Sequence, residues 1–315
     1  IAAMQRTAKA LAALDCLTGL SRAALKERYV RPQITNSREG RISIHDGRHP
    51  MVEHALKREM FVPNDTELNH TDQEMIIITG PNMAGKSTYM RQVAVLTIMA
   101  QTGSFIPAKS ASFAPVDRIF TRVGAADDIS TGQSTFMVEM KEVSHILCNA
   151  TKNSLILLDE IGRGTSTYDG MSIARAVVEY LNSKVHAYTL FATHYHELSD
   201  MAAENEHIKN YTVTVKERGK EITFLRRIVP GSADKSYGIH VARLAGLPES
   251  LLKRADEILE GLEVEGIKEE PAAPVIRRET ALNLFSSPII DELADLDVMS
   301  KTPIEAMEIL FRLSK

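Results

Sequence analysis

Apolar residues recur along the middle of the chain with two periods, and these periods predict alternating strands and helices. Apolar runs are typical of buried strands, and they occupy residues 75–79 and, ending in two carboxylates, 154–160; residues 186–194 predict a further strand and a turn. Alternation of apolar and polar residues predicts a further strand at 118–123 and a hairpin over 211–229. Helical spacing predicts helices at 87–101 and at 136–149. A third helix is expected after the glycine-rich loop 162–170, ending at about residue 182. This alternation predicts an α/β fold with a sheet flanked by helices.

The first part of the chain predicts a helix followed by a small strand unit. Residues 1 to about 29 are expected to form one helix, ended by Pro32, because apolar side chains recur at three- and four-residue spacing: Ile1, Met4, Ala8, Leu11 and Leu14. Such a helix needs a partner for its apolar face. Turn signals on both sides of an alternating stretch predict a hairpin within residues 33–53.

The last part of the chain changes character twice. Residues 233 to about 262 predict two helices with a break at the sequence Gly-Leu-Pro-Glu; because the second helix is not strongly basic, a packing or dimer-forming role is favoured over DNA reading. Residues 263–281 are charged, contain prolines and lack a period, which predicts a disordered linker. Residues 288–315 predict a small acidic and apolar helical unit, too short to bury a core alone, that self-associates or docks.

Charge and composition narrow the class of protein. The 315 residues carry a formal net charge of −4, so any contact with nucleic acid must come from a local patch or from another domain. Cys16 and Cys148 lie far apart without metal spacing and are interpreted as reduced, buried thiols of a cytosolic protein. No run of about 18 uncharged apolar residues exists, so we expect no membrane span and a cytoplasmic location. Because the chain begins as if within a helix, without Met, we expect a fragment of a longer protein.

The first candidate site follows the predicted strand at 75–79. Its sequence is G-x-x-x-x-G-K-S, a loop whose glycines turn backbone N–H groups toward phosphate at the start of a helix. Lys86 is expected to reach the outer phosphates, and the Ser87 hydroxyl is expected to bind Mg²⁺. The alternative, a chance glycine-rich turn, is disfavoured by the strand and helix on either side. The predicted nucleotide-binding residues are Gly80, Pro81, Asn82, Met83, Ala84, Gly85, Lys86, Ser87 and Thr88.

Two carboxylates end the apolar run at 154–160. A buried strand would deliver Asp159 and Glu160 to its carboxyl end, where ligands bind in open α/β sheets. Asp159 suits the shell of a Mg²⁺ ion, through water, and Glu160 is placed to orient or deprotonate an attacking water. The alternative is a strand that simply ends in solvated acids.

Three further positions have more than one interpretation. Ser134 lies in a hydroxyl-rich stretch at the start of a predicted helix, which suits either a second anion site or an ordinary N-cap. His194 suits contact with a γ-phosphate or a structural role; with His196 it suits a metal site, but no third ligand has a persuasive spacing. Phe61 and Val62 suit either core packing or stacking on adenine.

The motifs follow one another in the order of an ABC-type ATPase, in which the second anion site completes the active site of a partner subunit. Four stretches, GPNMAGKSTYMRQVA, GQSTFMVEM, LILLDEIGRGTSTYDG and FATHYHEL, together resemble the MutS family of DNA mismatch repair proteins. The resemblance runs almost continuously from about residue 4 to residue 262, and more loosely over 282–315. It implies a P-loop ABC-type ATPase with a mixed sheet flanked by helices.

The resemblance implies a role for each residue of the phosphate site. Lys86, Ser87 and Asn82 would bind phosphates and Mg²⁺, with Asp159 as the second metal-binding side chain. Glu160 would be the catalytic carboxylate, assisted by Lys86. The activity would be Mg²⁺-dependent conversion of ATP and water to ADP and phosphate.

The resemblance implies further contacts to the ends of the nucleotide. Phe61 and Val62 would pack on adenine, and His194 would contact the γ-phosphate as a further catalytic residue. Ser134 would reach, in trans, the γ-phosphate bound by the other subunit of a homodimer. Arg226 stands where some family members place a histidine near the base, so that contact is in doubt.

The resemblance also implies how the chain is divided. Residues 1–32 would be the end of a lever helix, 33–231 the ABC-type ATPase domain, 232–264 a helix-turn-helix dimerisation element, 265–287 a disordered linker and 288–315 a C-terminal oligomerisation module. The expected partners are a second copy through composite ATP sites, further copies in a tetramer through the tail, a sliding clamp through Leu282–Phe285, and a downstream mismatch repair protein. The family's mismatch-reading region is missing, so binding of mismatched double-stranded DNA would need domains outside this chain.

Two other classes of function remain as alternatives. A different ABC-type ATPase, such as a transporter motor, is disfavoured because STFMVEM stands where a transporter would carry an LSGGQ-like sequence; a chromosome-maintenance ATPase is disfavoured because no long coiled coil is present. A non-enzymatic assembly module that holds nucleotide as a structural ligand is disfavoured by the adjacent Asp159 and Glu160.

Overall fold

A computed structural model describes residues 1–36, 40–56, 60–81, 84–124, 134–218, 221–232 and 237–266. The chain divides into two compact units, Ile1–Asp256 and Glu257–Lys315, and of the second unit only the end of one helix is described. The expected start of the disordered linker, at residue 263 or 265, is wrong because the helix Glu249–Gly266 continues to Gly266; the rest of the linker and the tail, with Leu282–Phe285, lie outside the described residues.

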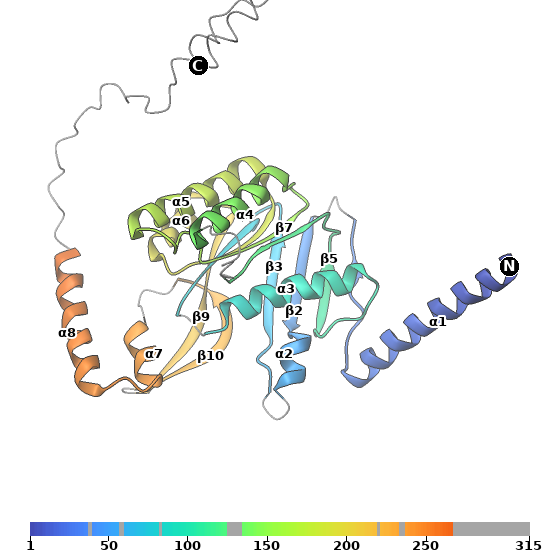
Figure 1. Ribbon diagram of the computed structural model, residues 1–315, viewed down its shortest axis with the longest axis horizontal. Helices are drawn as coiled ribbons and strands as arrows, with labels where there is room; N and C mark the ends of the chain where they lie inside the picture. Colours follow the sequence, from blue (N-terminus) through green and yellow to red (C-terminus); the bar gives the residue numbers. More distant parts are fainter. Residues whose placement is uncertain are drawn as a thin grey trace, which may run out of the picture. The chain divides into compact units, whose positions relative to one another are not determined.

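A six-stranded mixed sheet forms the centre of the first unit (Figure 1). Its strand order is β10-β9-β4-β8-β7-β6. The five strands from β9 to β6 pair in parallel, and β10 pairs antiparallel with β9. The strands are β4 (Met75–Thr79), β6 (Ile119–Arg122), β7 (Leu155–Asp159), β8 (Tyr188–Ala192), β9 (Ile208–Arg218) and β10 (Glu221–Pro230).

Alternate side chains of these strands enter two different cores, which explains why the central runs are apolar at nearly every position. Ile76 and Ile78 pack with one face of α3 (Lys86–Gln101), whereas Met75 and Ile77 pack with α4 (Thr135–Asn149) and α5 (Thr167–Tyr180). In Figure 1, α3 lies on one side of the sheet, and α4 and α5 lie on the other. The expected α/β fold with a mixed sheet flanked by helices is confirmed.

A second, four-stranded mixed sheet completes the core beside α3, with strand order β1-β5-β2-β3. Its strands are β1 (Gln33–Ile34), β2 (Arg41–Gly47), β3 (Asn64–Asn69) and β5 (Ser110–Phe113). The expected hairpin within 33–53 is wrong. β2 pairs with β3 and β5, and α2 (Pro50–Ala55) lies between β2 and β3 in the chain. The alternation of 41–44 correctly predicted a strand, but its pairing partners come from distant sequence.

Short helical turns connect several of these elements, and longer helices lie at the two ends of the described chain. A π-helical turn (Leu181–Val185) extends α5, and a 3₁₀ turn (His196–Asp200) with α6 (Met201–Glu204) follows β8. The predicted hairpin over 211–229 is confirmed as β9 and β10. The two helices expected after residue 233 are confirmed as α7 (Gly238–Leu244) and α8 (Glu249–Gly266).

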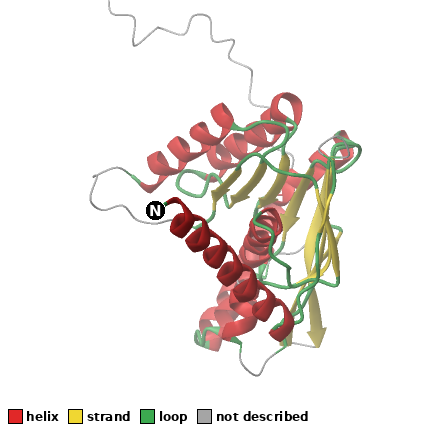
Figure 2. Cartoon of the chain, turned by 90° about the vertical axis from the view of Figure 1, so that its right-hand side faces the viewer, coloured by secondary structure: helices red, strands yellow, loops and turns green. Residues whose placement is uncertain are grey.

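The first helix, α1 (Ala2–Lys26), buries none of its residues. Figure 2 shows it as the helix that carries the N-terminal label. It ends at Lys26, about three residues before the expected end near residue 29. Leu11 and Leu14 are each 61% exposed, so the apolar face predicted from the sequence has no covering partner among the described residues.

Both cysteines are free, but the expectation that they are buried is wrong. Cys16 is exposed because α1 buries no side chain, and Cys148 is exposed in the last turn of α4, away from the face that packs on the sheet. Among the described residues, no helix combines the length and the apolar character needed to cross a bilayer.

Candidate nucleotide site

The glycine-rich loop joins the end of β4 to the start of α3, as the sequence predicted. Gly80 and Gly85 have φ angles of 129° and 103°, a region that favours glycine, and Gly85 is the N-cap of α3. The loop therefore reverses direction directly at a helix N-terminus, where unpaired N–H groups attract anions. Asn82 and Met83, which were predicted to bind nucleotide, lie outside the described residues.

Lys86 is buried at the first turn of α3 and folds back over the loop. Its Nζ donates to the carbonyl oxygens of Gly80, at 2.5 Å, and Pro81, at 3.0 Å. Burial lowers the pKa of the Lys86 ammonium, and the nearby carboxylates of Glu160 and Asp159 oppose that shift. The ammonium thus lies between the loop and the two acids, where a phosphate oxygen would complete its set of acceptors.

Asp159 ends β7 beside the loop because β7, β8 and β4 are successive parallel neighbours. The Ser87 hydroxyl donates a hydrogen bond to the Asp159 carboxylate. Burial raises the pKa of Asp159, and the Ser87 hydrogen bond acts in the opposite direction. Its Oδ1 atom is buried without a hydrogen-bond partner among the described residues. A buried carboxylate oxygen left open beside a hydroxyl suits a hard divalent cation.

Glu160 occupies a strained backbone position, with φ at 56° although it is not glycine. Its N–H donates to the Ala192 carbonyl oxygen at 2.9 Å, which fixes the main chain to the end of β8. Its carboxylate forms an ion pair with Arg163. The turn therefore presents the second acid at the same edge of the sheet as Asp159.

His194 follows β8 and reaches the same edge. Its ring lies 4.1 Å from the Tyr195 ring, and its Nδ1 is buried without a hydrogen-bond partner among the described residues. Burial lowers the pKa of His194, and the positive charges of Arg163 and Lys86 lower it further. The imidazole is thus held neutral near pH 7, with one nitrogen to donate and one to accept.

A cleft of about 170 Å³ opens beside the loop, and it contains the two residues proposed to hold a base. Phe61 and Val62 line it, with Thr88 and Arg226. Arg226 has a φ of 57° within the irregular pairing of β10, and its carbonyl accepts a hydrogen bond from Asn64 at 3.1 Å. Arg226 is thus held at the cleft by its main chain.

Gln92 also lines this cleft, although it was not among the predicted site residues. Its side chain is fully buried, and neither Nε2 nor Oε1 has a hydrogen-bond partner among the described residues. A buried amide without partners is costly unless a ligand or water satisfies it. The available signal was a polar residue on the buried face of a predicted helix, four residues after Thr88.

Ser134 caps the helix that the sequence predicted after it. Its Oγ accepts a hydrogen bond from the Met137 N–H at 3.2 Å, so the N-cap interpretation is confirmed. Ser134 is exposed on the first unit. Its assignment to a site shared with a second subunit stays a prediction.

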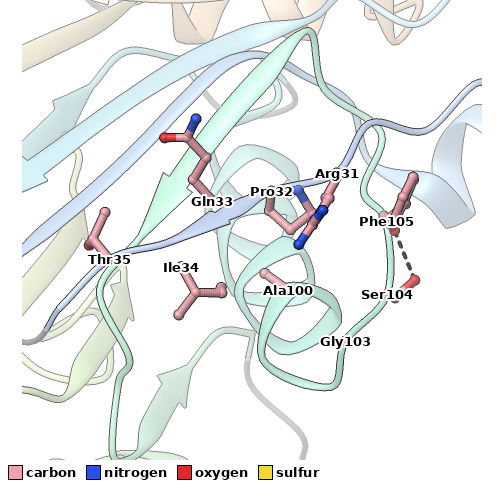
Figure 3. A pocket seen from close by; sticks show the side chains of 9 residues that line it. All are labelled: Arg31, Pro32, Gln33, Ile34, Thr35, Ala100, Gly103, Ser104 and Phe105. Atoms are coloured by element: carbon pink, nitrogen blue, oxygen red, sulfur yellow. Dashed lines mark hydrogen bonds between the residues drawn. The ribbon is translucent and has the colours of Figure 1, made fainter.

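A larger cavity than this cleft lies elsewhere in the described part of the chain. It measures about 780 Å³, and Figure 3 shows the segment 31–35 beside the last turn of α3 and the residues that follow it. None of the predicted site residues lines it; the lining residues are Arg31, Pro32, Gln33, Ile34, Thr35, Ala100, Gly103, Ser104 and Phe105. The converging phosphate loop, carboxylates and imidazole, rather than the larger volume, identify the candidate site.

The strand, glycine-rich loop and helix, with acids at the end of the parallel strand β7 and with β8 between β7 and β4, define a P-loop α/β protein of the ABC-type ATPase class. The family profile "MutS domain V" matches residues 76–263. The chain is 52% identical over 323 residues to the DNA mismatch repair protein MutS of Acetivibrio thermocellus, covering 99% of this chain and 37% of that protein. It is 54% identical over 312 residues to the corresponding protein of Syntrophomonas wolfei, covering 99% and 36%. The chain belongs to the MutS family, and it spans a little over a third of the length of these relatives.

Proposed function

We propose that this chain is the ATP-binding and ATP-hydrolysing portion of a DNA mismatch repair protein. One observation carries the proposal: Lys86, Asp159, Glu160 and His194 come from distant parts of the sequence and meet at the carboxyl ends of β4, β7 and β8. Membership of the MutS family supports the repair context.

In this proposal the phosphates of ATP bind the N–H groups of the loop and the Lys86 ammonium. The Ser87 hydroxyl and the open oxygen of Asp159 would hold Mg²⁺, which when bound neutralises charge on the phosphates. Glu160 accepts a proton from the attacking water as the water oxygen bonds to the γ-phosphorus and the bond to the bridging oxygen breaks, leaving ADP and phosphate. The neutral His194 imidazole donates to a γ-phosphate oxygen.

The cleft beside the loop receives the base. Phe61 and Val62 supply apolar surface, and Arg226 lines the same cleft. The unpartnered amide of Gln92 offers one donor and one acceptor to a base edge. An adenine edge, which also presents one donor and one acceptor side by side, fits this amide.

We further propose that two copies share the ATP sites, with Ser134 of one copy contacting the γ-phosphate bound by the other. Domains outside this chain would bind mismatched DNA, and the tail would support further assembly, clamp docking and contact with a downstream repair protein. A cytoplasmic location belongs to the same proposal. The coupling of nucleotide state to these contacts would be the function of the whole protein.

Sedimentation of the chain carrying Glu160→Gln, with and without ATP and Mg²⁺, tests the shared site. We expect a nucleotide-dependent shift to a dimer or larger assembly. A chain that binds ATP but stays monomeric would contradict the shared-site proposal while leaving nucleotide binding intact.

Mixing subunits tests Ser134 directly. Dimers formed between Lys86→Ala and Ser134→Ala subunits should contain one intact composite site and recover part of the turnover that each variant lacks alone. If heterodimers form but no turnover returns, the role of Ser134 in trans is wrong.

A further inference from the structure

Glu139 is a buried acid that the roles above do not use. It lies in the second turn of α4, on the helix that Ser134 caps, and its side chain is 7% exposed. Its Oε1 accepts a hydrogen bond from the Gly162 N–H at 2.6 Å. Its Oε2 accepts from the Arg122 Nη2 at 3.4 Å, and Arg122 also donates to the Gly124 carbonyl oxygen. One carboxylate therefore joins α4 to the end of β6 and to the loop after β7.

Both main-chain polar groups of Gly162 form hydrogen bonds with side chains. Its N–H binds Glu139, and its carbonyl oxygen accepts from the Tyr195 hydroxyl at 3.2 Å. Its Cα also lies against the main chain of Gly170 so closely that an added Cβ would collide with the Gly170 carbonyl oxygen. Gly162 stands two residues after Glu160, and Tyr195 stands next to His194. The main chain beside the candidate base is thus tied to α4 and to the strand end that carries the candidate γ-phosphate contact.

A second contact fixes the start of α4 to the same loop. A Cβ added to Gly164 would lie 2.8 Å from the Phe136 Cβ, so the first turn of α4 packs directly on the loop main chain. With Glu139 one turn further along, the loop after Glu160 and the helix start at Ser134 form one continuous set of contacts.

A buried ion pair is not by itself a reason for stability. Apolar side chains of similar volume often serve equally well or better, because burying two charges costs solvation energy. Placement of a carboxylate under the Gly162 N–H therefore calls for a role in geometry rather than in stability alone.

We propose that Glu139 is a positioning residue for hydrolysis: it holds the loop that sets the Glu160 carboxylate and ties that loop to the helix capped by Ser134. The inference rests on the proposed ATPase function. It implies that Glu139 connects two residues of the same chain: Glu160, the candidate base of one site, and Ser134, which is proposed to contact the nucleotide in the partner's site.

Two double variants of the full chain test the inference. Arg122→Met with Glu139→Leu removes the acceptor for the Gly162 N–H without leaving a buried guanidinium unpaired. Arg122→Met with Glu139→Gln also removes both charges but keeps an amide oxygen for that N–H. We expect kcat to fall about ten- to a hundredfold in the leucine variant and to recover largely in the glutamine variant, since a small displacement of a catalytic group is costly. ATP affinity should change by less than about threefold in both variants, because the interactions that hold ATP equally in the ground state and the transition state are unchanged.

Glu142→Gln is the matched control. Glu142 lies on the same helix and pairs with the Arg122 Nε at 3.0 Å, but its side chain is half exposed, and the Gly162 N–H is bound by Glu139 instead. Its turnover should remain at the level of the unmodified chain.

The outcomes separate this inference from the proposed function. Unchanged kcat in the leucine variant overturns the positioning role. The positioning role is also overturned if the leucine variant has both a weaker ATP affinity and a lower melting temperature and the glutamine variant does not restore them. The role of Glu139 would then be structural. An unmodified chain that does not bind ATP with Mg²⁺ overturns the proposed function itself, and this inference with it.

Discussion

The two ends of the parallel strands carry different kinds of polar cluster. At the amino ends, Asp117 accepts hydrogen bonds from the hydroxyls of Thr151, at 2.6 Å, and Ser154, at 2.8 Å. At the same ends, Glu74 lies 3.1 Å from the His186 Nδ1 and 3.6 Å from the His70 Nδ1. Both acids therefore lie within hydrogen-bond or ion-pair distance of other side chains of the protein.

At the carboxyl ends, polar groups are buried without complete pairing. Asp159 Oδ1 and His194 Nδ1 have no hydrogen-bond partner among the described residues, and Glu160 has a positive φ angle. Incomplete pairing and backbone strain together are costly, and they persist where a bound ligand can complete the site.

The pKa directions of two aspartates express the same difference. Burial acts to raise the pKa of Asp117, but hydrogen bonds from Thr151 and Ser154 outweigh it and leave that pKa below its usual value. Burial raises the pKa of Asp159 above its usual value despite the Ser87 hydrogen bond. The amino-end carboxylate is therefore stabilised in its charged form by the protein, whereas the support that the carboxyl-end carboxylate receives does not offset the effect of its burial. For these acids, the amino-end carboxylates are paired within the protein, whereas the carboxyl-end carboxylates would be completed by the ligand proposed above.

The largest expected effect comes from the acid nearest to the proposed chemistry. Glu160→Gln should lower ATP turnover about 10²- to 10⁴-fold with ATP binding retained, because the proposed proton acceptor is lost. Phosphate release measured against ATP binding by titration calorimetry checks this. Glu74→Gln, at the amino end, is the control and should leave turnover unchanged. Equal loss in the two variants would contradict the division between the two ends.

The next effect concerns phosphate affinity. Lys86→Met should weaken ATP binding by about a hundredfold, since charge-assisted hydrogen bonds contribute about 1.5–3 kcal/mol. Binding of a fluorescent ATP analogue measures the change. Lys152→Met changes an exposed lysine near the amino end of β7 and should have no such effect. Retained affinity in Lys86→Met would remove the phosphate role from this lysine.

A packing change at the start of α5, where it contacts the loop after β7, should have an intermediate effect. Gly170→Ala should lower the free energy of unfolding by about 1–3 kcal/mol, because its Cβ would collide with the Gly162 carbonyl oxygen and the Tyr195 hydroxyl. Gly19→Ala, in the exposed helix α1 with nothing near its Cβ, should be neutral or slightly stabilising. Urea denaturation compares the stability of the two variants. Equal denaturation midpoints would show that the main chain around Gly162 moves to accept the new Cβ without a loss of stability.

The smallest effects should have opposite signs at the two ends. Asp117→Asn should cost about 0.5–1.5 kcal/mol at neutral pH, as expected for weakened hydrogen bonds. Since its folded pKa is lowered from 3.8, the stability it supplies is present above that value and is lost as pH falls through the folded pKa.

Asp159→Asn should instead stabilise the chain without nucleotide or Mg²⁺ at neutral pH. Its folded pKa is raised from 3.8, so the charged carboxylate costs stability above the folded pKa, and the cost disappears below 3.8, where both states are protonated. Thermal unfolding of both variants from pH 3 to 7 tests the pair. Destabilisation by Asp159→Asn under these conditions would contradict the comparison.

Local patterns in the sequence determined much of this protein. The glycines, Lys86 and the preceding apolar run predicted a strand, loop and helix, and the structure contains all three. The helical period predicted α1, α3 and α4, and an N-cap was one of the two interpretations of the hydroxyl before α4. These features depend on residues close in sequence, so their periods and caps can be recognised without the fold.

Only the tertiary structure decided which distant residues meet. Strand order places β8 between β4 and β7, so Lys86, Asp159 and His194 share one edge, although the sequence separates the first two by more than 70 residues. Pairing of β2 with β3 and β5, exposure of Cys148, burial of Gln92 and the contact of Glu139 with Gly162 were likewise invisible to local pattern. Periodicity predicts which face of an element is buried, but burial of a single polar atom and its partner depend on what the rest of the chain packs against it.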